Sequence, residues 1–399
     1  MKIDKFLSRR GREAYFPKDG IIAQTAEARG KGINATIGIA LGDDSAPMRL
    51  KSIAEKVSLD PKEVFTYAPS FGKPELRLVW KEEIKKKNPG IKGELSLPVV
   101  TNGITHGLSV VGHLFVDEGD RIILPDRFWG NYKLVFEKAY GAVLDTFNTF
   151  KDGSFDIGAM KEKLAGDGKK ILLLNFPNNP TGYTPTEEEV QAIVGIVKQS
   201  GDVLVICDDA YFGLVYEDGI YKESVFSELA GLENVLAVKL DGATKEECAW
   251  GLRVGFMTFG GLSPEENQIL EEKTAGIIRG GISNVSHLSQ SLVLHGLKTG
   301  DDTNQHAILQ RRFMKVKETL KEDRYRKYFS PYPFNSGYFM CLKLKGADAE
   351  GVRKKLLERY DTGVVAMGGV LRIAFSSVKE DDIPDLFENI FNACEEVSR

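Results

Sequence analysis

The sequence predicts an α/β protein, a three-layer sandwich around a mainly parallel sheet, together with a smaller α+β domain. From about residue 97 to residue 260, short apolar runs alternate with helical patterns, as expected for strands buried on both faces. From about residue 296, the pattern changes to strands followed by terminal helices, which is typical of an α+β unit. The chain has 399 residues, 42% of them hydrophobic. This length exceeds the roughly 250–300 residues that a single hydrophobic core usually holds together, so two cores are expected.

The first part of the chain supplies the expected sheet. Apolar runs rich in β-branched residues predict strands over 97–102, 121–125, 169–177, 202–208, 234–240 and 251–260. Helical spacing of apolar residues predicts helices over 104–116, 128–140 and 187–199. Ligands of such sheets bind beyond the carboxyl ends of the strands, so the residues that follow each run are the first candidates for a site.

The C-terminal part has a different order of elements. Its patterns predict a charged helix over 304–328, strands over 338–346 and 370–378, and helices over 347–360 and 379–397. The first 47 residues contain little regular pattern, and we expect them to join this smaller domain. The predicted division is an N-terminal segment 1–47, a large domain 48–300 and a small C-terminal domain 301–399.

Composition excludes several classes of function. The net charge of −4 gives no basic field for nucleic acid, and the lysine-rich stretch 81–87 is expected to be a solvated helix face. No run approaches the ~18 apolar residues of a membrane span, and the N-terminus lacks the apolar core of a secretion signal. The cysteines lie far apart, without CxxC pairs or histidines at metal spacing, so we expect no metal site and a reducing, cytoplasmic location: Cys207, Cys248, Cys341 and Cys394.

The first candidate site is the segment 102–107 (NGITHG), where a strand gives way to a helix. A helix N-terminus offers unpaired N–H groups and the positive end of its dipole, and Thr105 adds a hydroxyl. The segment therefore suits an anion such as a phosphate, although most glycine turns between a strand and a helix are only turns. It is not a nucleotide-binding P-loop, since no Gly-Lys-Ser/Thr follows.

The second candidate is the segment 175–182 (NFPNNPTG), directly after an expected strand. Two prolines and a final glycine form a rigid strand exit, which presents the Asn179 side chain at the carboxyl edge of the sheet. The bond between Asn179 and Pro180 is a candidate for the cis form, which costs little before proline. The alternative is an ordinary loop.

Charged residues follow the next two expected strands. Asp208 ends one strand, where a carboxylate can keep a protonated ring nitrogen cationic, and Tyr211 can donate to a phenolate oxygen. The alternative role of Asp208 is to cap the backbone that follows. Lys245 follows the next strand and stands eight residues before Arg253, whose fork suits a phosphate. A lysine beside another cation and apolar walls favours its neutral, nucleophilic form.

In combination these motifs resemble the class I/II aminotransferases of the fold-type I pyridoxal 5′-phosphate (PLP) enzymes, and among them the aspartate aminotransferase group. The matching motifs run in the family's order from Tyr67 to Arg372. The resemblance implies that Lys245 holds PLP as a Schiff base and later carries the proton, and that Asp208 pairs with the pyridine nitrogen. It implies further cofactor contacts from Asn179 and Tyr211 at the phenolate oxygen, from Thr105, Thr244 and Arg253 at the phosphate, and from Trp129 stacked on the ring, with Asn179 and Trp129 also touching the substrate.

The resemblance implies that three more residues bind the substrate or reach the active site of a neighbouring subunit. Arg372, in LRIAFS, matches the arginine that forks onto the substrate's α-carboxylate. Arg279 matches an arginine that the partner subunit supplies for the distal carboxylate of aspartate or glutamate, and its alternative role is to neutralise helix-end carbonyls. Tyr67 matches the tyrosine that reaches the phosphate of the neighbouring subunit. The resemblance therefore implies a homodimer with shared active sites.

The predicted function is a PLP-dependent aminotransferase that moves an amino group between aspartate, glutamate or an aromatic amino acid and a 2-oxo acid, with ping-pong kinetics. Gly242 departs from the family, which usually has a hydroxyl residue three positions before the lysine, so one phosphate contact is missing or replaced. A PLP-dependent lyase or decarboxylase, such as a carbon–sulfur β-lyase, shares every cofactor residue and stays an alternative. A non-catalytic regulator is disfavoured, because the motifs begin by Tyr67 and leave no room for a DNA-binding module.

Overall fold

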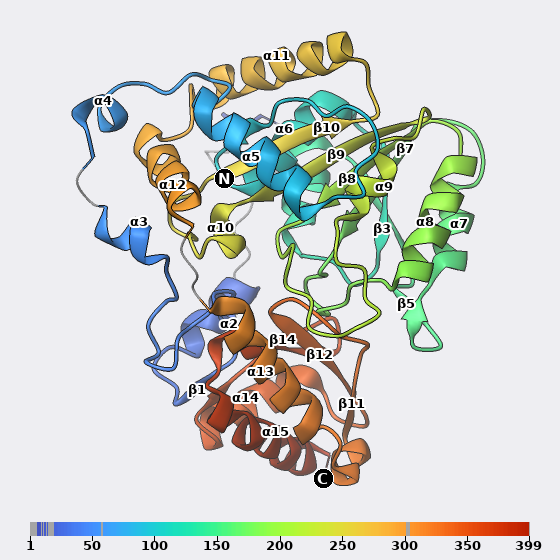
Figure 1. Ribbon diagram of the computed structural model, residues 1–399. Helices are drawn as coiled ribbons and strands as arrows, with labels where there is room; N and C mark the ends of the chain where they lie inside the picture. The colour runs from blue at the N-terminus through green and yellow to red at the C-terminus, as the bar shows by residue number, and fades with distance from the viewer. Residues whose placement is uncertain are drawn as a thin grey trace.

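A seven-stranded sheet forms the centre of the larger part of the molecule. The computed structural model describes residues 6–8, 10, 12, 14, 20–56, 59–300 and 304–398 (Figure 1). In spatial order the strands of this sheet are β2 (Val99–Thr101), β10 (Gly255–Gly260), β9 (Val235–Gly242), β8 (Val203–Asp208), β7 (Lys170–Asn175), β3 (Arg121–Pro125) and β4 (Val143–Phe147). Within it β10 runs antiparallel to both of its neighbours, whereas the other pairs are parallel. The predicted, mainly parallel sheet is confirmed.

Helices cover both faces of this sheet and complete the three layers. One face packs against α5 (Pro74–Lys87), α7 (Ile157–Leu164), α8 (Glu187–Gln199) and α9 (Val225–Leu229). The other face packs against α6 (Ile104–Phe115), the π-helix η2 (Lys133–Lys138) and α11 (Pro264–Gly281). Local sequence fixes where these helices begin. Thr186 and Ser263, for example, start α8 and α11 as capping boxes that satisfy the free N–H groups of the first turn.

The C-terminal part has a sheet of its own, in the lower half of Figure 1. Its antiparallel strands are, in order, β11 (Phe329–Pro331), β12 (Phe339–Leu344), β15 (Val370–Ala374) and β14 (Val365–Met367). The helices packed with it are α13 (Gln305–Thr319), α14 (Ala349–Arg359) and α15 (Ile383–Val397). In the N-terminal segment, β1 (Ile33–Asn34) pairs with β13 (Thr362–Gly363), and α2 (Ile21–Glu27) lies beside β13 and β14. The domain boundaries 47/48 and 300/301 stay a prediction; residues 301–303 and most of 1–19 lie outside the described residues.

Short elements connect these layers. They are α3 (Lys51–Glu55), α4 (Pro61–Val64), α10 (Ala243–Glu246), the hairpin β5 (Phe150–Lys151) and β6 (Ser154–Phe155), and the 3₁₀ turns η3 (Asp323–Lys327), η4 (Phe375–Ser377) and η5 (Glu380–Asp382). A longer helix, α12 (His287–Thr299), packs beside α5. The four-residue helix α10 follows β9 directly and carries Lys245.

Three local predictions are corrected. The helix expected over 128–140 contains six residues of π-helix, a form that is enriched at functional sites. The helix expected over 304–328 ends at Thr319, and η3 follows it because Tyr325 turns inward and stacks on Phe329. The cis peptide bond of the segment 175–182 joins Phe176 to Pro177 rather than Asn179 to Pro180.

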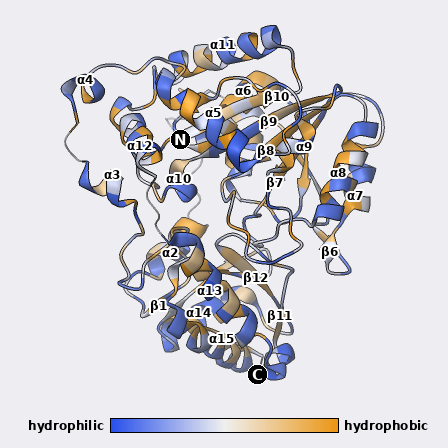
Figure 2. Cartoon of the chain, in the orientation of Figure 1, coloured by the Kyte–Doolittle hydropathy of each residue, from blue (hydrophilic) through white to orange (hydrophobic). Residues whose placement is uncertain are grey.

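Hydropathy follows the layers. Figure 2 shows hydrophobic colours concentrated on the central strands, with hydrophilic residues on the outer helices. Every helix in the described ranges is too short or too polar to cross a bilayer. The sheet residues are therefore held by burial of apolar side chains on both faces, and the strand ends are left to carry the polar residues of a site.

Candidate active site

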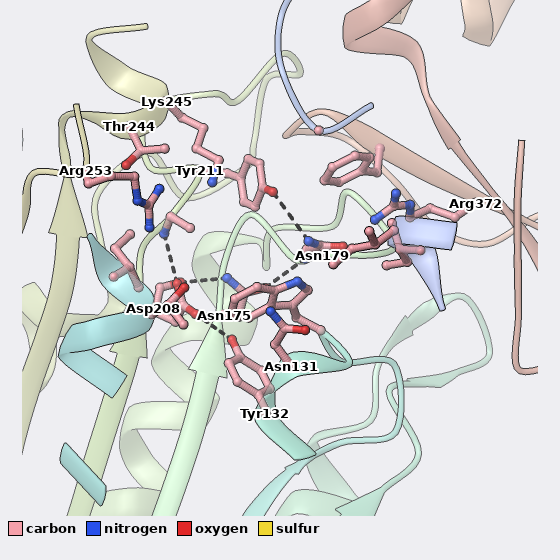
Figure 3. Close-up of a pocket in the computed structure, with 18 residues that line it drawn as sticks. Asn131, Tyr132, Asn175, Asn179, Asp208, Tyr211, Thr244, Lys245, Arg253 and Arg372 are labelled. Atoms are coloured by element: carbon pink, nitrogen blue, oxygen red, sulfur yellow. Dashed lines mark hydrogen bonds between the residues drawn. The ribbon is translucent and has the colours of Figure 1, made fainter. Parts of the chain in front are cut away.

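A cavity of about 280 Å³ opens at the carboxyl ends of β7, β8 and β9 (Figure 3). Nine of the eleven site residues predicted from the sequence line it: Thr105, Trp129, Asn179, Asp208, Tyr211, Thr244, Lys245, Arg253 and Arg372. They come from both parts of the chain, because Arg372 belongs to β15 whereas the others lie near the ends of strands of the central sheet or in the helices that follow them. The cavity therefore lies between the two sheets.

Asp208 is the last residue of β8 and is buried. Its Oδ2 accepts a hydrogen bond from the Tyr132 hydroxyl at 2.6 Å, and its Oδ1 accepts one from the backbone N–H of Ala210 at 3.2 Å. Capping of the following backbone, the alternative considered for Asp208, thus occurs while the carboxylate still faces the cavity. Burial raises the pKa of Asp208 to about 6, and the bonds from Tyr132 and Ala210 oppose that rise.

Lys245 projects from α10 into the same cavity (Figure 3). Its Nζ lies 4.8 Å from the centre of the Tyr211 ring. Burial lowers the pKa of Lys245 to about 8; the charge of Asp208 opposes this shift and that of Arg253 adds to it. A substantial fraction of the amine is therefore neutral near pH 8, as a nucleophile or a general base requires.

Asn179 and Tyr211 lie side by side at this end of the sheet. The Asn179 Nδ2 donates to the Tyr211 hydroxyl at 3.4 Å, and the Asn179 backbone N–H donates to Oδ1 of Asn175 at 2.8 Å. Asn175 in turn donates to the backbone carbonyl of Asp208 at 2.7 Å. Two neighbouring strand ends are thus joined by side-chain hydrogen bonds, which fix the groups that face the cavity.

The anion-binding corner consists of Thr105, Thr244 and Arg253. Gly103 precedes α6 with a φ of +75°, and a Cβ at this position would overlap the guanidinium of Arg253. Glycine is favoured here by the backbone conformation, and any side chain at this position would displace the guanidinium of Arg253. The Arg253 Nη1 also donates to the carbonyl of Trp250 at 3.4 Å, and this bond helps to fix the orientation of the guanidinium.

Gly242, where the resemblance implies a hydroxyl residue, has no room for a side chain. In the register of β9 and β10 it stands opposite Gly255, and a Cβ on Gly242 would lie 2.7 Å from both the Gly255 Cα and the Val254 carbonyl oxygen. Backbone atoms cannot move aside as the end of a side chain can. A hydroxyl residue therefore does not fit here without separating the two strands.

Arg372 reaches the cavity from β15. It is buried, with its Cζ 4.4 Å from the centre of the Phe339 ring and its Nη2 donating to the Thr36 carbonyl at 3.0 Å. Its Nε is buried and has no hydrogen-bond partner among the described residues. Burial lowers its pKa from the usual value. A buried guanidinium with an unused donor is prepared for a carboxylate that the chain itself does not provide.

Two predicted residues lie outside this cavity. Tyr67 is 89% exposed, and Arg279 is exposed in the last turn of α11, where its Nη1 donates to the Ser283 hydroxyl at 2.9 Å. Both were expected to act in the site of a partner subunit. That expectation stays a prediction.

Sequence reasoning missed several residues that line the cavity. The most important is Tyr132, which lies three residues after Trp129 within the helix predicted over 128–140; this spacing was the available signal. Others are apolar or amide neighbours without a distinctive pattern: Ile21, Ile22, Gly38, Ile104, Asn131, Asn175, Ala210 and Phe339.

Comparison with known proteins agrees with this geometry. Residues 31–390 match the family described as aminotransferase class I and II. A probable aspartate/prephenate aminotransferase of Aquifex aeolicus is 28% identical over 397 residues, which cover 94% of this chain and 95% of that protein. An aspartate aminotransferase of Geobacillus stearothermophilus is 32% identical over 194 residues, 48% of this chain and 47% of that protein. A solved aminotransferase of Anaerococcus prevotii has the same fold, with a TM-score of 0.84, 23% identity and coverage of 98% and 99%.

Proposed function

This chain belongs to the class I and II aminotransferase family, and from that premise we propose that it uses PLP to transfer the amino group of a dicarboxylic amino acid, aspartate or glutamate, to a 2-oxo acid. Aromatic amino acids are the second substrate class that we propose. The observation that carries the proposal is the meeting of an amine, a carboxylate and a spare guanidinium in one cavity, at Lys245, Asp208 and Arg372.

The residues of the cavity fit this cofactor. Lys245 provides an amine that can bond an aldehyde, and the buried Asp208 carboxylate can balance a protonated ring nitrogen. Thr105, Thr244 and Arg253 would hold the phosphate. Asn179 and Tyr211 would donate to the phenolate oxygen, and Trp129 would cover the ring. When bound, PLP supplies a ring that takes up the electron pair left as the substrate carbon loses a proton.

The protein's own groups then have separate tasks. The Arg372 guanidinium binds the α-carboxylate and orients the substrate beside the amine. The neutral Lys245 amine removes the proton from the substrate carbon and returns it during the same transfer. Tyr132 and the Ala210 N–H keep Asp208 in its anionic form at neutral pH, against the effect of burial. We expect ping-pong kinetics, because the donor and the acceptor use one cavity in turn.

Substrate preference follows from the second guanidinium. Arg279 would bind a distal carboxylate, which favours aspartate and glutamate over neutral aliphatic amino acids. The names of the relatives, aspartate/prephenate and aspartate aminotransferase, support this preference. The apolar residues Ile21, Ile22 and Phe339 at the cavity support the aromatic class.

We propose that the chain forms a homodimer, which Arg279 would need in order to reach a site. The segments that carry Tyr67 and Arg279 are joined by a hydrogen bond between Thr66 Oγ1 and His287 Nδ1 at 3.0 Å and by one that the Ser70 hydroxyl donates to the Ser283 carbonyl at 2.8 Å. Large apolar side chains are exposed along these segments: Phe65, Tyr67, Ile282 and Leu288. Such a patch favours association with another protein surface. We also propose a cytoplasmic location, since the four cysteines, all among the described residues, are buried and form no disulfide bond.

A mixing experiment tests the reaction, the cofactor and the dimer together. Lys245→Ala alone should lose the absorbance of bound PLP and nearly all formation of 2-oxoglutarate from glutamate, and Arg279→Ala alone should lose activity on dicarboxylic substrates. Random refolding of the two variants together should restore about a quarter of the wild-type activity, since half of the dimers would carry one complete site of two.

The outcomes separate the parts of the proposal. Activity retained by Lys245→Ala would refute the assignment of the lysine. No restoration on mixing would refute the contribution of Arg279 from a partner. Release of ammonia and pyruvate in place of amino transfer would identify a lyase.

A further inference from the structure

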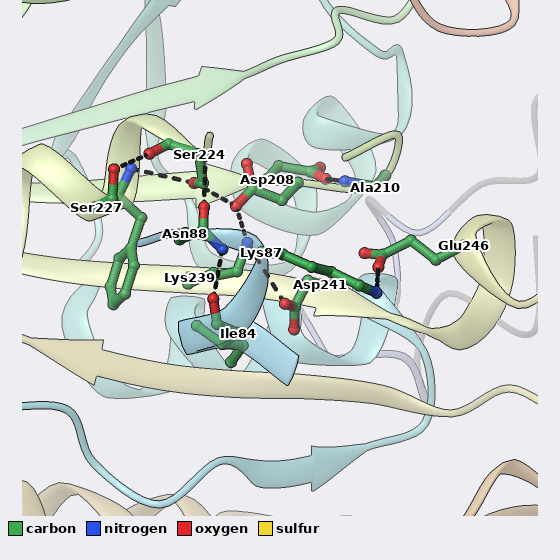
Figure 4. A network of polar contacts seen from close by, with 12 residues as sticks. Ile84, Lys87, Asn88, Asp208, Ala210, Ser224, Ser227, Lys239, Asp241 and Glu246 are labelled. Atoms are coloured by element: carbon green, nitrogen blue, oxygen red, sulfur yellow. Dashed lines mark hydrogen bonds and ion pairs between the residues drawn. The ribbon is translucent and has the colours of Figure 1, made fainter. Parts of the chain in front are cut away.

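A cluster of charged side chains is buried behind the active site (Figure 4). Lys239, on β9, has no exposed surface, and its Nζ donates to Oδ2 of Asp209 and lies 3.4 Å from Oδ2 of Asp241. Each carboxylate has one more partner: Ser224 donates to Asp209 at 2.6 Å, and the Trp80 indole donates to Asp241 at 2.9 Å. We call Lys239, Asp209 and Asp241 the Lys239 cluster.

The cluster lies on the face of the sheet opposite the cavity. Lys239 and Asp241 are two residues apart on β9, so their side chains point to the same face, and Leu240 between them points to the other. Leu240 belongs to the core that contains Tyr132, the partner of Asp208. Trp80, the partner of Asp241, belongs to the core beneath α5. Only the backbone of the sheet separates the cluster from the groups that face the cofactor.

The two carboxylates of the cluster lie close in sequence to the carboxylate and the amine of the site, Asp208 and Lys245. Asp209 directly follows Asp208, and its backbone N–H donates to the Leu240 carbonyl at 2.9 Å. Asp241 stands four residues before Lys245, at the end of the strand that leads into α10. One buried ammonium group therefore joins the end of β8 to the end of β9, where the carboxylate and the amine of the site begin.

A second ion pair holds the helix α10 beside Lys245. Lys87, at the end of α5, lies 2.7 Å from Glu246, the residue after Lys245 (Figure 4). The lysine-rich stretch of α5 was expected to be solvated, but its last residue, Lys87, contacts α10, the helix that carries Lys245. Each of the two reacting groups is followed by an acidic residue held in an ion pair.

Stability alone does not account for the Lys239 cluster. Buried ion pairs return little net stability, because both charges lose their hydration, and apolar side chains of similar size often serve as well. Here one cation faces two carboxylates, so the three groups do not even balance when all are ionised. An arrangement that is costly to bury and that joins two catalytic strand ends indicates a role in the reaction.

We propose that Lys239 and Asp209 are positioning residues: they hold the Asp208 carboxylate and the start of α10 at their working separation, and they set the local charge behind the site. This inference rests on the proposed function, since it concerns how the PLP-binding groups are held. Tyr132 and Lys245 face Asp208, and the charge of Asp209 acts on it from the other face of the sheet. The groups that face Lys245 are Asp208, Arg253 and Tyr211.

The test follows the absorbance of PLP bound to the whole protein as a function of pH. Asp209→Asn removes one negative charge and keeps the shape, so proton release becomes easier and the midpoint of the titration should fall by about one pH unit. Asp241→Asn, which keeps the Lys239–Asp209 pair, should lower the midpoint by less. It provides a milder variant should the first one fold poorly.

A double variant separates position from charge. Lys239→Met with Asp209→Asn removes a cation and an anion together, so the midpoint should stay near that of the wild type. The dissociation constant of PLP should nevertheless rise about tenfold, because Asp208 has lost its anchor. Arg77→Met is the control, since it cuts another buried ion pair, with Glu271 at 2.8 Å, away from the reacting groups. It should destabilise the protein and leave both the midpoint and the PLP affinity unchanged.

The inference is overturned if Asp209→Asn keeps the wild-type midpoint or if the double variant binds PLP as tightly as the wild type. Equal shifts in Arg77→Met would also overturn it, because they would show a general effect of destabilisation. A wild-type protein that binds no PLP would instead contradict the proposed function.

Discussion

Tyr132 is the partner of Asp208 that the sequence did not identify, and Tyr132→Phe tests its role directly. The substitution removes only the hydroxyl, which donates to Asp208 at 2.6 Å within the buried site. The ring keeps its packing against Trp129, 5.6 Å away between centroids, and against Phe128 at 6.3 Å. Any change in the behaviour of Asp208 is therefore due to the lost hydrogen bond.

The size of the effect follows from the energy of that bond. A hydrogen bond to a charged group is worth about 1.5–3 kcal/mol, and 1.36 kcal/mol corresponds to about one pKa unit. Losing the bond should therefore raise the pKa of Asp208 from about 6 to roughly 7–8. The ionised fraction at pH 7 then falls about two- to tenfold.

The assay is the affinity of the apo-protein for PLP, measured between about pH 5 and pH 9. Since the cationic ring nitrogen needs an anionic partner, affinity should fall below about pH 6 for the wild type and already below roughly pH 7–8 for Tyr132→Phe. The two proteins should converge near pH 9. Tyr140→Phe is the matched control, because this tyrosine donates at 2.7 Å to the Ser109 carbonyl away from the cavity. An affinity loss of equal size at every pH would refute the reasoning and leave Tyr132 a packing role.

Two further predictions concern stability. Burial raises the pKa of Asp208 from 3.8 to about 6, so its favourable contribution to folding is complete below pH 4 and is lost as the pH rises through 6. The stability of apo Asp208→Asn relative to the wild type should therefore increase by up to about 3 kcal/mol between pH 4 and pH 7 in denaturant unfolding, and a constant difference would contradict this. Gly242→Ser should lose about 1–3 kcal/mol of stability and bind PLP more weakly, because its Cβ would meet the Gly255 backbone at 2.7 Å. Tighter PLP binding by this variant would show that the strands can separate to admit the hydroxyl.

The parts of the site that could be predicted are those fixed by parallel topology. Asn179, Asp208 and Lys245 each follow a buried apolar run, and neighbouring parallel strands bring their carboxyl ends to one edge of the sheet. The pattern of runs alone therefore gathers these residues, without knowledge of loop geometry. The fold class was predictable for the same reason, since runs buried on both faces require covering helices.

Other features depend on contacts that no local pattern encodes. Tyr132 meets Asp208 because the turn before the π-helix η2 directs its hydroxyl inward, and the sequence predicts an ordinary helix there. From the sequence, Gly242 indicates only that a phosphate contact is missing. The register of β9 and β10, which pairs it with Gly255, explains why a side chain does not fit there. Lys239 would be expected in solvent from its type, but the strand order brings Asp209 and Asp241 to it. These contacts are set by tertiary pairing over long separations in sequence.

Two of the buried carboxyl groups at this end of the sheet, Asp208 and Asp241, show why the apo-site is costly. Burial raises the pKa of both Asp208 and Asp241 to about 6. Asp241 has a cation, Lys239, at 3.4 Å, whereas the cation that acts on Asp208 is Lys245, whose own pKa burial lowers to about 8. In the apo-protein, two hydrogen bonds and the charge of Lys245 are what support the Asp208 anion. In the proposed function, a positive ring nitrogen would pair with this anion and recover part of that free energy, so the same buried charge that weakens the apo-protein would help to retain the cofactor.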